Sequence, residues 1–367
     1  MAEIATKLFS WLNKRLPIVN TFERHLSKHP VPSKVNFWYL FGALAAVTLI
    51  IQIVTGIWLI MPYSNTEEQA FSSIEYIMRD VDYGWVIRYM HTTGASLFFA
   101  VVYLHMFRGL LYGSYQKPKE LVWIFGCTIY LAMMAEGFLG YVLPYGQMSY
   151  WGATVITNLL SPFPCLIVWI CGGFYISNPT LKRFLIFHFI LPFILCGFII
   201  IHFYYLHYLS SNNSLGYNTN NKVHFLPFEL IKDIFGLFII ITLYTIQLYF
   251  GIFSLSHPDN AFQVNELVTP LHIVPEWYFL SYYTMLKAIP NKNAGFIILL
   301  TSILILLSLG ESHFHRLNCS FFLIILCFLW IGAQLPQEIF ISYGRILTLF
   351  YYKIIIYLLF AINVNEI

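Results

Sequence analysis

Charged residues are scarce in this sequence. Asp, Glu, Lys and Arg make up 10% of the 367 residues, whereas 59% of the residues are hydrophobic and 19% are aromatic. Because about a quarter of the residues in a soluble domain are charged, the composition excludes a water-soluble globular protein. The formal net charge is only +3 and no long basic run occurs, which excludes nucleic acid as the main partner. We therefore expect a membrane protein whose surroundings are the lipid bilayer.

Cysteine motifs are also missing. The six cysteines occur singly, without a Cys-x-x-Cys pair, which excludes a cysteine zinc site, a thiolate iron–sulfur cluster and a covalent c-type haem. We expect them to act as small apolar residues. The first thirty or so residues are polar and lack the apolar run and cleavage site of a secretory signal.

Long apolar segments dominate the rest of the chain. A helix needs about 20 apolar residues to cross the hydrocarbon core, and eight segments approach this length. We predict an all-α integral membrane protein with eight transmembrane helices. The expected spans lie near residues 36–60, 84–110, 122–142, 183–208, 230–252, 296–310, 319–336 and 345–362.

The spans suggest an organisation of the chain and a topology. A polar N-terminal segment (1–35) would precede a four-helix bundle (36–210) and four C-terminal helices (211–367). Eight crossings place both termini on one side, whose loops hold most of the 20 Lys and Arg residues and should face the negative compartment. The two longest connections, 143–182 and 253–295, lie on the other side, where we expect short helices and packed turns at the membrane surface.

Four of the 12 histidines are regularly spaced. His91 and His105 share one expected span, His188 and His202 share another, and each pair has the same spacing of fourteen positions. Fourteen helical residues make nearly four turns, so both histidines of a pair face the same way, about 21 Å apart along the axis. Buried imidazoles need partners, and polar groups inside a membrane tend to be functional. Two facing helices would thus offer two stacked bis-histidine sites.

Glycines repeat this spacing on the neighbouring spans. Gly42 and Gly56 are separated by the same fourteen positions, as are Gly126 and Gly140. A glycine inside a membrane helix is usually a packing device, but four residue pairs with one spacing favour a common explanation. We predict a bundle that holds two non-covalent b-type haems, with the histidines as iron ligands and the glycines giving room to the porphyrin edges.

Two arginines stand beside the expected ligands. Arg88 precedes His91 by three residues, and Arg108 follows His105 by three. Each would pair with the propionates of the nearer haem, although arginines that snorkel to the lipid interface are an alternative. Two other functions stay open at this point. One is a di-haem anchor that takes electrons from a peripheral dehydrogenase, and the other is a transporter without redox chemistry.

Four sequence motifs carry a family resemblance. They read Arg88-Tyr-Met-His91-Thr-Thr-Gly-Ala-Ser, Gly140-Tyr-Val-Leu-Pro-Tyr-Gly-Gln-Met-Ser-Tyr-Trp-Gly152-Ala-Thr-Val-Ile-Thr-Asn, Ser256-His-Pro-Asp-Asn and Pro275-Glu276-Trp277-Tyr278. In this order they resemble the mitochondrial-type cytochrome b family, whose members are the central subunit of quinol:cytochrome c oxidoreductase, respiratory complex III. The chloroplast type is split into two chains and has one more residue between the histidines of its fourth helix, so it is disfavoured.

The resemblance implies roles for the matching residues. His91 and His188 would ligate the low-potential haem on the side of the long loops. His105 and His202 would ligate the high-potential haem near the termini. Glu276 would accept a proton from ubiquinol, in a pocket formed with Tyr278, Gly152 and Tyr283. The site where ubiquinone is reduced, at the opposite surface, would include His207, Ser211, Lys232 and Asp233.

The resemblance also implies partners and a location. One electron from quinol would leave for a Rieske iron–sulfur protein and then a cytochrome c-type haem, while the other crosses the membrane through the two haems, coupled to proton translocation. Since the sequence has no ligands for a Rieske cluster or a covalent haem, these partners must be separate polypeptides. The family works as a homodimeric complex in the mitochondrial inner membrane, so the termini would face the matrix.

Glu136 departs from the family pattern. Its position, four residues before Gly140, normally carries a small or hydroxyl residue. An ionised carboxylate inside a span is costly, so this group should be protonated, paired or near a wet cavity. We expect it to border the quinol pocket, with Lys287 or Arg88 as partner. The alternative is a neutral acid bonded to a carbonyl of its own helix.

Overall fold

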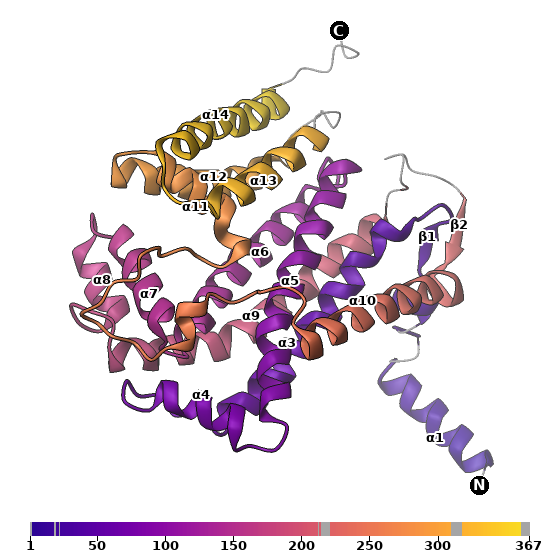
Figure 1. The fold of residues 1–367 in the computed structure, drawn as a ribbon. Coiled ribbons are helices and arrows are strands. Elements are labelled where there is room, and N and C mark those ends of the chain that lie inside the picture. Colours follow the sequence, from indigo (N-terminus) through magenta and orange to yellow (C-terminus); the bar gives the residue numbers. More distant parts are fainter. Residues whose placement is uncertain are drawn as a thin grey trace.

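The computed structural model of the chain is built almost entirely of helices (Figure 1). It describes residues 2–17, 20–21, 23–211, 213, 221–309 and 318–360. The short connection between the sixth and seventh expected spans, and the end of the eighth, lie outside these residues. The description of the fold therefore rests on the helices and on the connections between them that are covered.

The N-terminal segment runs along one end of the molecule. Helix α1 (Ala2–Arg15) extends away from the body, and a π-helical turn, η1 (Glu23–Ser27), follows it. Strand β1 (Pro30–Pro32) pairs antiparallel with β2 (Lys222–His224). This short ladder holds the segment before the first long helix against the connection between two later ones.

Four long helices form the centre of the fold. The 3₁₀ turn η2 (Phe37–Leu40) leads into α3 (Phe41–Ile60), which packs against α5 (Gly84–Leu111), while α6 (Glu120–Val142) packs against α9 (Asn178–Leu209). Ser177 begins α9 with a capping box, in which Thr180 Oγ1 accepts a hydrogen bond from the Ser177 backbone N–H at 3.1 Å. Such a box supplies hydrogen-bond partners at the start of a helix, where the first backbone N–H groups have no carbonyl partner within the helix.

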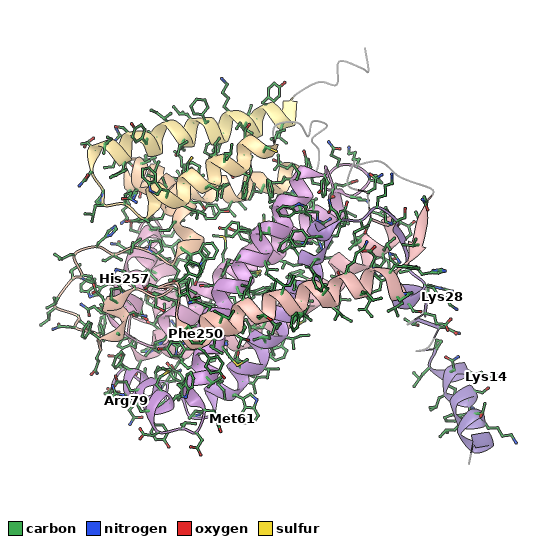
Figure 2. All side chains as sticks on the ribbon, turned by 45° about the vertical axis from the view of Figure 1, so that its right-hand side comes forward. Lys14, Lys28, Met61, Arg79, Phe250 and His257 are labelled. Atoms are coloured by element: carbon green, nitrogen blue, oxygen red, sulfur yellow. The ribbon has the colours of Figure 1, made fainter. Side chains whose placement is uncertain are left out.

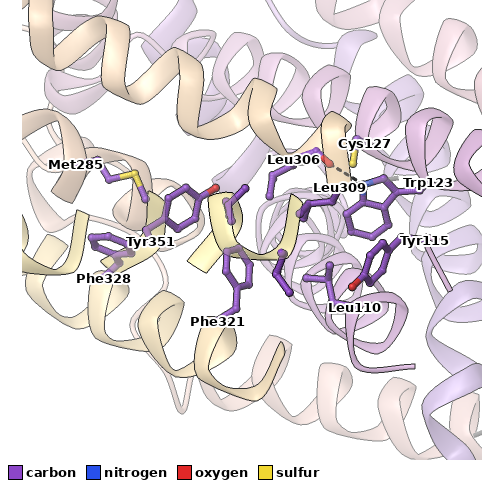
Figure 3. Close-up of a cluster of buried hydrophobic side chains, with 12 residues drawn as sticks. Leu110, Tyr115, Trp123, Cys127, Met285, Leu306, Leu309, Phe321, Phe328 and Tyr351 are labelled. Carbon is purple, nitrogen blue, oxygen red and sulfur yellow. Dashed lines mark hydrogen bonds between the residues drawn. The ribbon is translucent and has the colours of Figure 1, made fainter. Parts of the chain in front are cut away.

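The remaining long helices lie beside this centre. The turn η3 (Phe225–Glu229) precedes α10 (Leu230–Phe250), and the C-terminal group comprises α11 (Leu280–Ala288), α12 (Lys292–Ser308), α13 (Asn318–Gly332) and α14 (Glu338–Phe360). A cluster of buried side chains joins this group to α5 and α6 (Figure 3). Within it, Trp123 Nε1 donates to the carbonyl of Leu306 at 2.7 Å.

The two longest connections contain short helices. Residues 143–182 hold α7 (Gln147–Leu159) and α8 (Pro164–Cys171), and residues 253–295 hold the 3₁₀ turns η4 (Pro258–Ala261) and η5 (Trp277–Phe279) as well as α11. Helix α4 (Ala70–Arg79) lies between α3 and α5. Tyr145, in the first of these connections, is buried, and its hydroxyl donates to the Ile176 carbonyl at 3.1 Å.

The outer faces of the long helices are apolar. Ile200 on α9, Phe238 on α10 and Leu349 on α14 are 70%, 69% and 73% exposed, which is the pattern of a surface that meets lipid rather than water. Five helices of the described chain are long and apolar enough to cross a membrane: residues 37–60, 84–111, 120–142, 178–209 and 338–359. The apolar helices α12 and α13 are shorter, so the chain is a mainly helical protein with several apolar spans, and the count of eight stays a prediction.

The two ends of the helices can be told apart. Met61 after α3, Arg79 at the end of α4 and Phe250 at the end of α10 lie toward one end in Figure 2, and Lys28 lies toward the other. The starts of α5 and α9 share the first end, because α5 follows α4 and the Glu67 backbone N–H, between α3 and α4, donates to Asn178 Oδ1 at 2.8 Å. The N-terminal segment, together with the ends of α5 and α9, occupies the second end.

Candidate functional site

The structure brings the four regularly spaced histidines together in two pairs. The rings of His91 and His188 have their centroids 6.2 Å apart, and those of His105 and His202 are 6.3 Å apart. A metal–imidazole bond is about 2 Å long, so two such bonds and the radii of two rings span roughly 6 Å. Each pair is therefore spaced as two imidazole ligands of one metal ion would be.

A glycine faces each of these rings. A Cβ atom at Gly42 would lie 3.2 Å from Cε1 of His105, and one at Gly56 would lie 3.1 Å from Cε1 of His91. On α6, Gly126 faces His202 in the same way at 3.3 Å, and Gly140 is packed still more tightly against His188. The glycines were expected to give room to porphyrin edges. In the structure their absent side chains make room for the histidine rings themselves.

The second nitrogen of two rings is held by a neighbouring helix. His91 Nδ1 lies 2.9 Å from Thr55 Oγ1, and this hydroxyl donates to the Ile51 carbonyl at 2.6 Å. His188 Nδ1 lies 2.7 Å from Glu136 Oε1 and 3.1 Å from the backbone oxygen of the same residue. With Nδ1 engaged in this way, Nε2 is the atom that would bind a metal.

The two arginines lie beside the pairs as expected. Arg88 lines the cavity that contains His91. Arg108 has its guanidinium over the ring of Tyr39, 4.7 Å from the centroid, and Nη2 is 3.4 Å from His105 Nδ1. Its Nε is buried without a hydrogen-bond partner among the described residues. An unsatisfied buried donor next to a ligand pair fits the propionate of a haem.

One cavity collects residues from all four sequence motifs. It is lined both by the His91 and His188 pair and by Glu276 and Tyr278. Its further lining residues from the motifs are Arg88, Thr92, Ala95, Ser96, Gly140, Tyr141, Leu143, Pro144, Ser256 and Asn260. A molecule bound near Glu276 would thus lie in the same cavity as one histidine pair.

Glu276 has the properties of a proton acceptor in this cavity. Burial raises the pKa of its carboxyl group from 4.5 to about 7, and a hydrogen bond from Tyr141 works against this shift. A group with this pKa is divided between its acid and base forms at neutral pH. The loop is anchored because Trp277 Nε1 donates to Ser96 Oγ at 3.1 Å and Tyr278 stacks on Phe99 at a centroid distance of 4.0 Å.

Two residues expected in this pocket lie elsewhere. Neither Gly152 nor Tyr283 is among the residues that line the cavity in the described chain. Gly152, on α7, has open space where its side chain would be. Tyr283 is on α11, and its hydroxyl donates to the Ile273 carbonyl at 3.3 Å. Both positions depend on how the two long connections pack, which the motifs alone do not specify.

The residues expected at the opposite end gather around the N-terminal segment. His207 lies in the last turn of α9 and stacks on His29 with a centroid distance of 4.0 Å, and Ser211 follows this helix. Lys232 and Asp233 lie in the first turn of α10, where Lys232 Nζ donates to Glu229 Oε1 at 2.8 Å and to the Val35 carbonyl at 3.1 Å.

Sequence reasoning missed two residues at this end. His29 and Glu229 are buried, with 8% and 5% exposure. A histidine and a glutamate that flank helices are common in any sequence, so only the chain's tertiary contacts bring them to notice. The pairing of Lys232 with Glu229 also shows that Lys232 is already engaged in the structure.

The expected partner of Glu136 was wrong. Glu136 does line the cavity with Glu276, but its side chain pairs with His188. Lys287 instead donates to the carbonyls of Ile331, Gly332 and Gln334. The glutamate lies one helical turn before Gly140, so it reaches the same histidine that this glycine faces.

Comparisons with known proteins agree with this geometry. Family models described as "Cytochrome b/b6/petB" and "Cytochrome b(C-terminal)/b6/petD" match residues 26–210 and 263–352. Cytochrome b of Plasmodium chabaudi is 46% identical over 355 residues, covering 91% of this chain and 93% of the relative. Cytochrome b of Triticum aestivum is 43% identical over 366 residues, covering 95% of this chain and 92% of the relative.

A solved structure is similar over almost the whole fold. It is described as "Hyperthermophilic respiratory Complex III", with a TM-score of 0.87 and 32% identity, and the match covers 95% of this chain and 97% of that one. Both family models together span well over half of the sequence, and they include both histidine pairs and the Glu276 turn. The chain belongs to the cytochrome b/b6 family.

Proposed function

We propose that this chain is the membrane subunit of quinol:cytochrome c oxidoreductase, which oxidises ubiquinol at one membrane face and conducts electrons to the other. The observation that carries the proposal is the pair of facing histidine sites. They have nearly equal ring separations and a glycine opposite every ring. A transporter without redox chemistry has no use for this arrangement, and the relatives are cytochromes b.

The histidines of each pair would hold one b-type haem. His91 and His188 would ligate the haem at the cavity end, and His105 and His202 the haem at the end of the N-terminal segment. When bound, the two haems supply one-electron transfer across the membrane. Arg88 and Arg108 would neutralise the propionates, and the apolar surfaces of the helices exclude water from the rings.

Glu276 and Tyr278 would form the quinol-oxidation site with the cavity. Quinol oxidation releases two protons with the two electrons, so a proton acceptor must lie within hydrogen-bond reach of the substrate. The carboxylate form of Glu276 would accept one of these protons. Gly152 and Tyr283 would then act from outside the cavity, as parts of the elements that position its loops.

The opposite end would reduce quinone. His207 and Asp233 would donate protons there, with Ser211 and Lys232 as polar neighbours. The stacking of His29 on His207 supports a shared role for the two rings. It places a second imidazole next to the expected proton donor.

The chain would function inside a multisubunit complex. The likeness to a solved complex III supports this membership. Of the two electrons from each quinol, one would pass through the haems of this chain, and the other would pass to a Rieske iron–sulfur protein and then to a cytochrome c-type subunit. The complex would be a homodimer. It would lie in the mitochondrial inner membrane, with eight spans and both termini on the matrix side.

Replacing single histidines tests the proposed ligation. His188→Leu in the assembled complex should remove the haem at the cavity end and leave the other, and His202→Leu should do the reverse. Haem content and reduced-minus-oxidised spectra measure the outcome. His224→Leu is the control, because this exposed histidine lies on β2, away from both pairs. A His188 or His202 variant that keeps both haems with unchanged spectra would refute the pairing.

A further inference from the structure

Glu136 is a partly buried group to which the proposed electron transfer assigns no role. Its side chain is 17% exposed, and Oε1 lies 2.7 Å from Nδ1 of His188. The other oxygen, Oε2, is buried and has no hydrogen-bond partner in the described part of the chain. The carboxyl group therefore directs its one strong polar contact at an expected iron ligand.

Coordination decides the direction of this hydrogen bond. If Nε2 of His188 binds iron, Nδ1 carries the remaining hydrogen of the ring and must donate. Glu136 Oε1 is then the acceptor, alongside the backbone oxygen of the same residue at 3.1 Å. A carboxyl oxygen at this distance draws the hydrogen toward itself and makes the imidazole a stronger electron donor to the metal.

The other three expected ligands have different neighbours. His91 Nδ1 meets the hydroxyl of Thr55, and His105 Nδ1 lies near the guanidinium of Arg108, which has no acceptor. His202 Nδ1 is buried and has no side-chain partner among the described residues. Among the four, and within the residues that the structure describes, His188 is the one whose ring meets a carboxyl group. Any electronic effect of such a partner would thus fall on the cavity-end site alone.

We propose that Glu136 lowers the midpoint potential of the cavity-end haem by accepting a hydrogen bond from Nδ1 of His188. A more basic ligand favours the oxidised over the reduced iron, and hydrogen bonding to axial ligands is one of the ways a protein sets haem potential. The inference rests on the haem ligation proposed above. It makes Glu136 a positioning residue that acts through His188. Its effect would be to increase the difference between the midpoint potentials of the two haems.

Potentiometric titration of the assembled complex tests this role. Glu136→Gln keeps the size of the side chain but offers a weaker acceptor, so the midpoint of the cavity-end haem should shift to more positive values. The midpoint of the other haem should not change. Glu136→Thr, which removes the carboxyl group and shortens the side chain, should give a shift of the same sign. Glu120→Gln is the matched control, because it makes the same substitution on α6 near the opposite end and should leave the cavity-end potential unchanged.

The outcomes separate this inference from the proposed function. If both Glu136 variants hold two haems with wild-type potentials, the role of Glu136 is wrong while the ligation stands. If both variants lose both haems, Glu136 is needed for assembly and the tuning role is likewise wrong. If His188→Leu leaves the haem content of the otherwise unmodified complex intact, the ligation itself fails.

Discussion

Glu276 illustrates how burial gives an ordinary residue a chemical task. The carboxyl group lies in a turn outside the spans, and its burial in the cavity brings its pKa to about 7. Because this pKa lies above the usual 4.5, the proton-accepting carboxylate is present above pH 7 and is lost as the pH falls through that value. The direction of the pH dependence therefore follows from the sign of the shift.

Glu276→Gln should slow quinol oxidation and change its pH dependence. The amide keeps the size of the side chain but cannot accept a proton, and a general base contributes about a hundredfold or more to rate. The wild-type rate should rise as the pH increases through 7, and the variant should be slow and lack this rise. Steady-state rates on both sides of pH 7, with haem spectra as a check on assembly, measure the effect.

Glu266→Gln serves as the control for this experiment. Glu266 belongs to the same connection and contacts the Tyr145 hydroxyl at 3.4 Å, but it does not line the cavity in the described chain. Its substitution should leave the pH profile unchanged. A Glu276→Gln enzyme with wild-type turnover across this range would remove Glu276 from the proton path.

Gly140→Ala and Gly152→Ala should differ sharply in their effect on haem. The added methyl group at Gly140 would collide with the His188 ring, whereas Gly152 has open space at the same place. Overpacking of this kind costs about 1–3 kcal/mol, so Gly140→Ala should displace His188 and lower the occupancy of the cavity-end haem. Gly152→Ala should keep both haems. Equal haem content in the two variants would show that the contact at Gly140 has no influence on binding.

Spacing along a helix made the histidine pairs predictable. The contacts of other site residues could not be predicted, because they depend on packing between segments. A repeated separation of nearly four helical turns fixes which side chains share a face because helical geometry is regular. The partner of Glu136, the absence of Gly152 from the cavity and the stacking of His29 on His207 depend on contacts between elements that are distant in sequence. No periodic pattern records such contacts.

At the scale of elements, Lys287 joins two helices of the C-terminal group. From α11 its Nζ donates to the carbonyls of Ile331, Gly332 and Gln334 at 2.8, 3.1 and 2.9 Å. The last carbonyls of an α-helix have no partner within the helix. Lys287 therefore caps the end of α13 and ties α11 to it.

Lys287→Met should destabilise this end of α13 without changing the haem sites. Hydrogen bonds to a charged donor contribute about 1.5–3 kcal/mol, and buried carbonyls would lose their partner. The temperature at which the complex loses quinol oxidation should fall, while the haem spectra before heating stay the same. Lys292→Met is the control, since Lys292 contacts the exposed Asn158 side chain. Equal thermal midpoints for the two variants would argue against the cap.

Element boundaries followed from composition where the apolar runs were long. Helices α5 and α6 begin and end within two residues of the expected spans, whereas α9 begins at Asn178, five residues earlier than expected. The earlier start reflects the Ser177 capping box, which is a local polar signal that a hydropathy window averages away. The turns η1 and η3 were not expected from the sequence.

At the scale of the whole molecule, the proposed electron path would run along residues of this chain alone. The cavity that holds Glu276 contains the first histidine pair, and helices α5 and α9 carry the second pair toward the other end. A mainly helical membrane protein was predictable from composition. The convergence of four motifs on one cavity was not, because they come from four separate stretches of the chain.

The most direct test of this account is a reduced-minus-oxidised spectrum of the assembled complex with ubiquinol as the reductant, combined with a determination of haem per copy of this chain. The account predicts two b-type haems per chain, both reducible by quinol and titrating at separate potentials. A chain that holds no haem, or whose haems quinol cannot reduce, would contradict it.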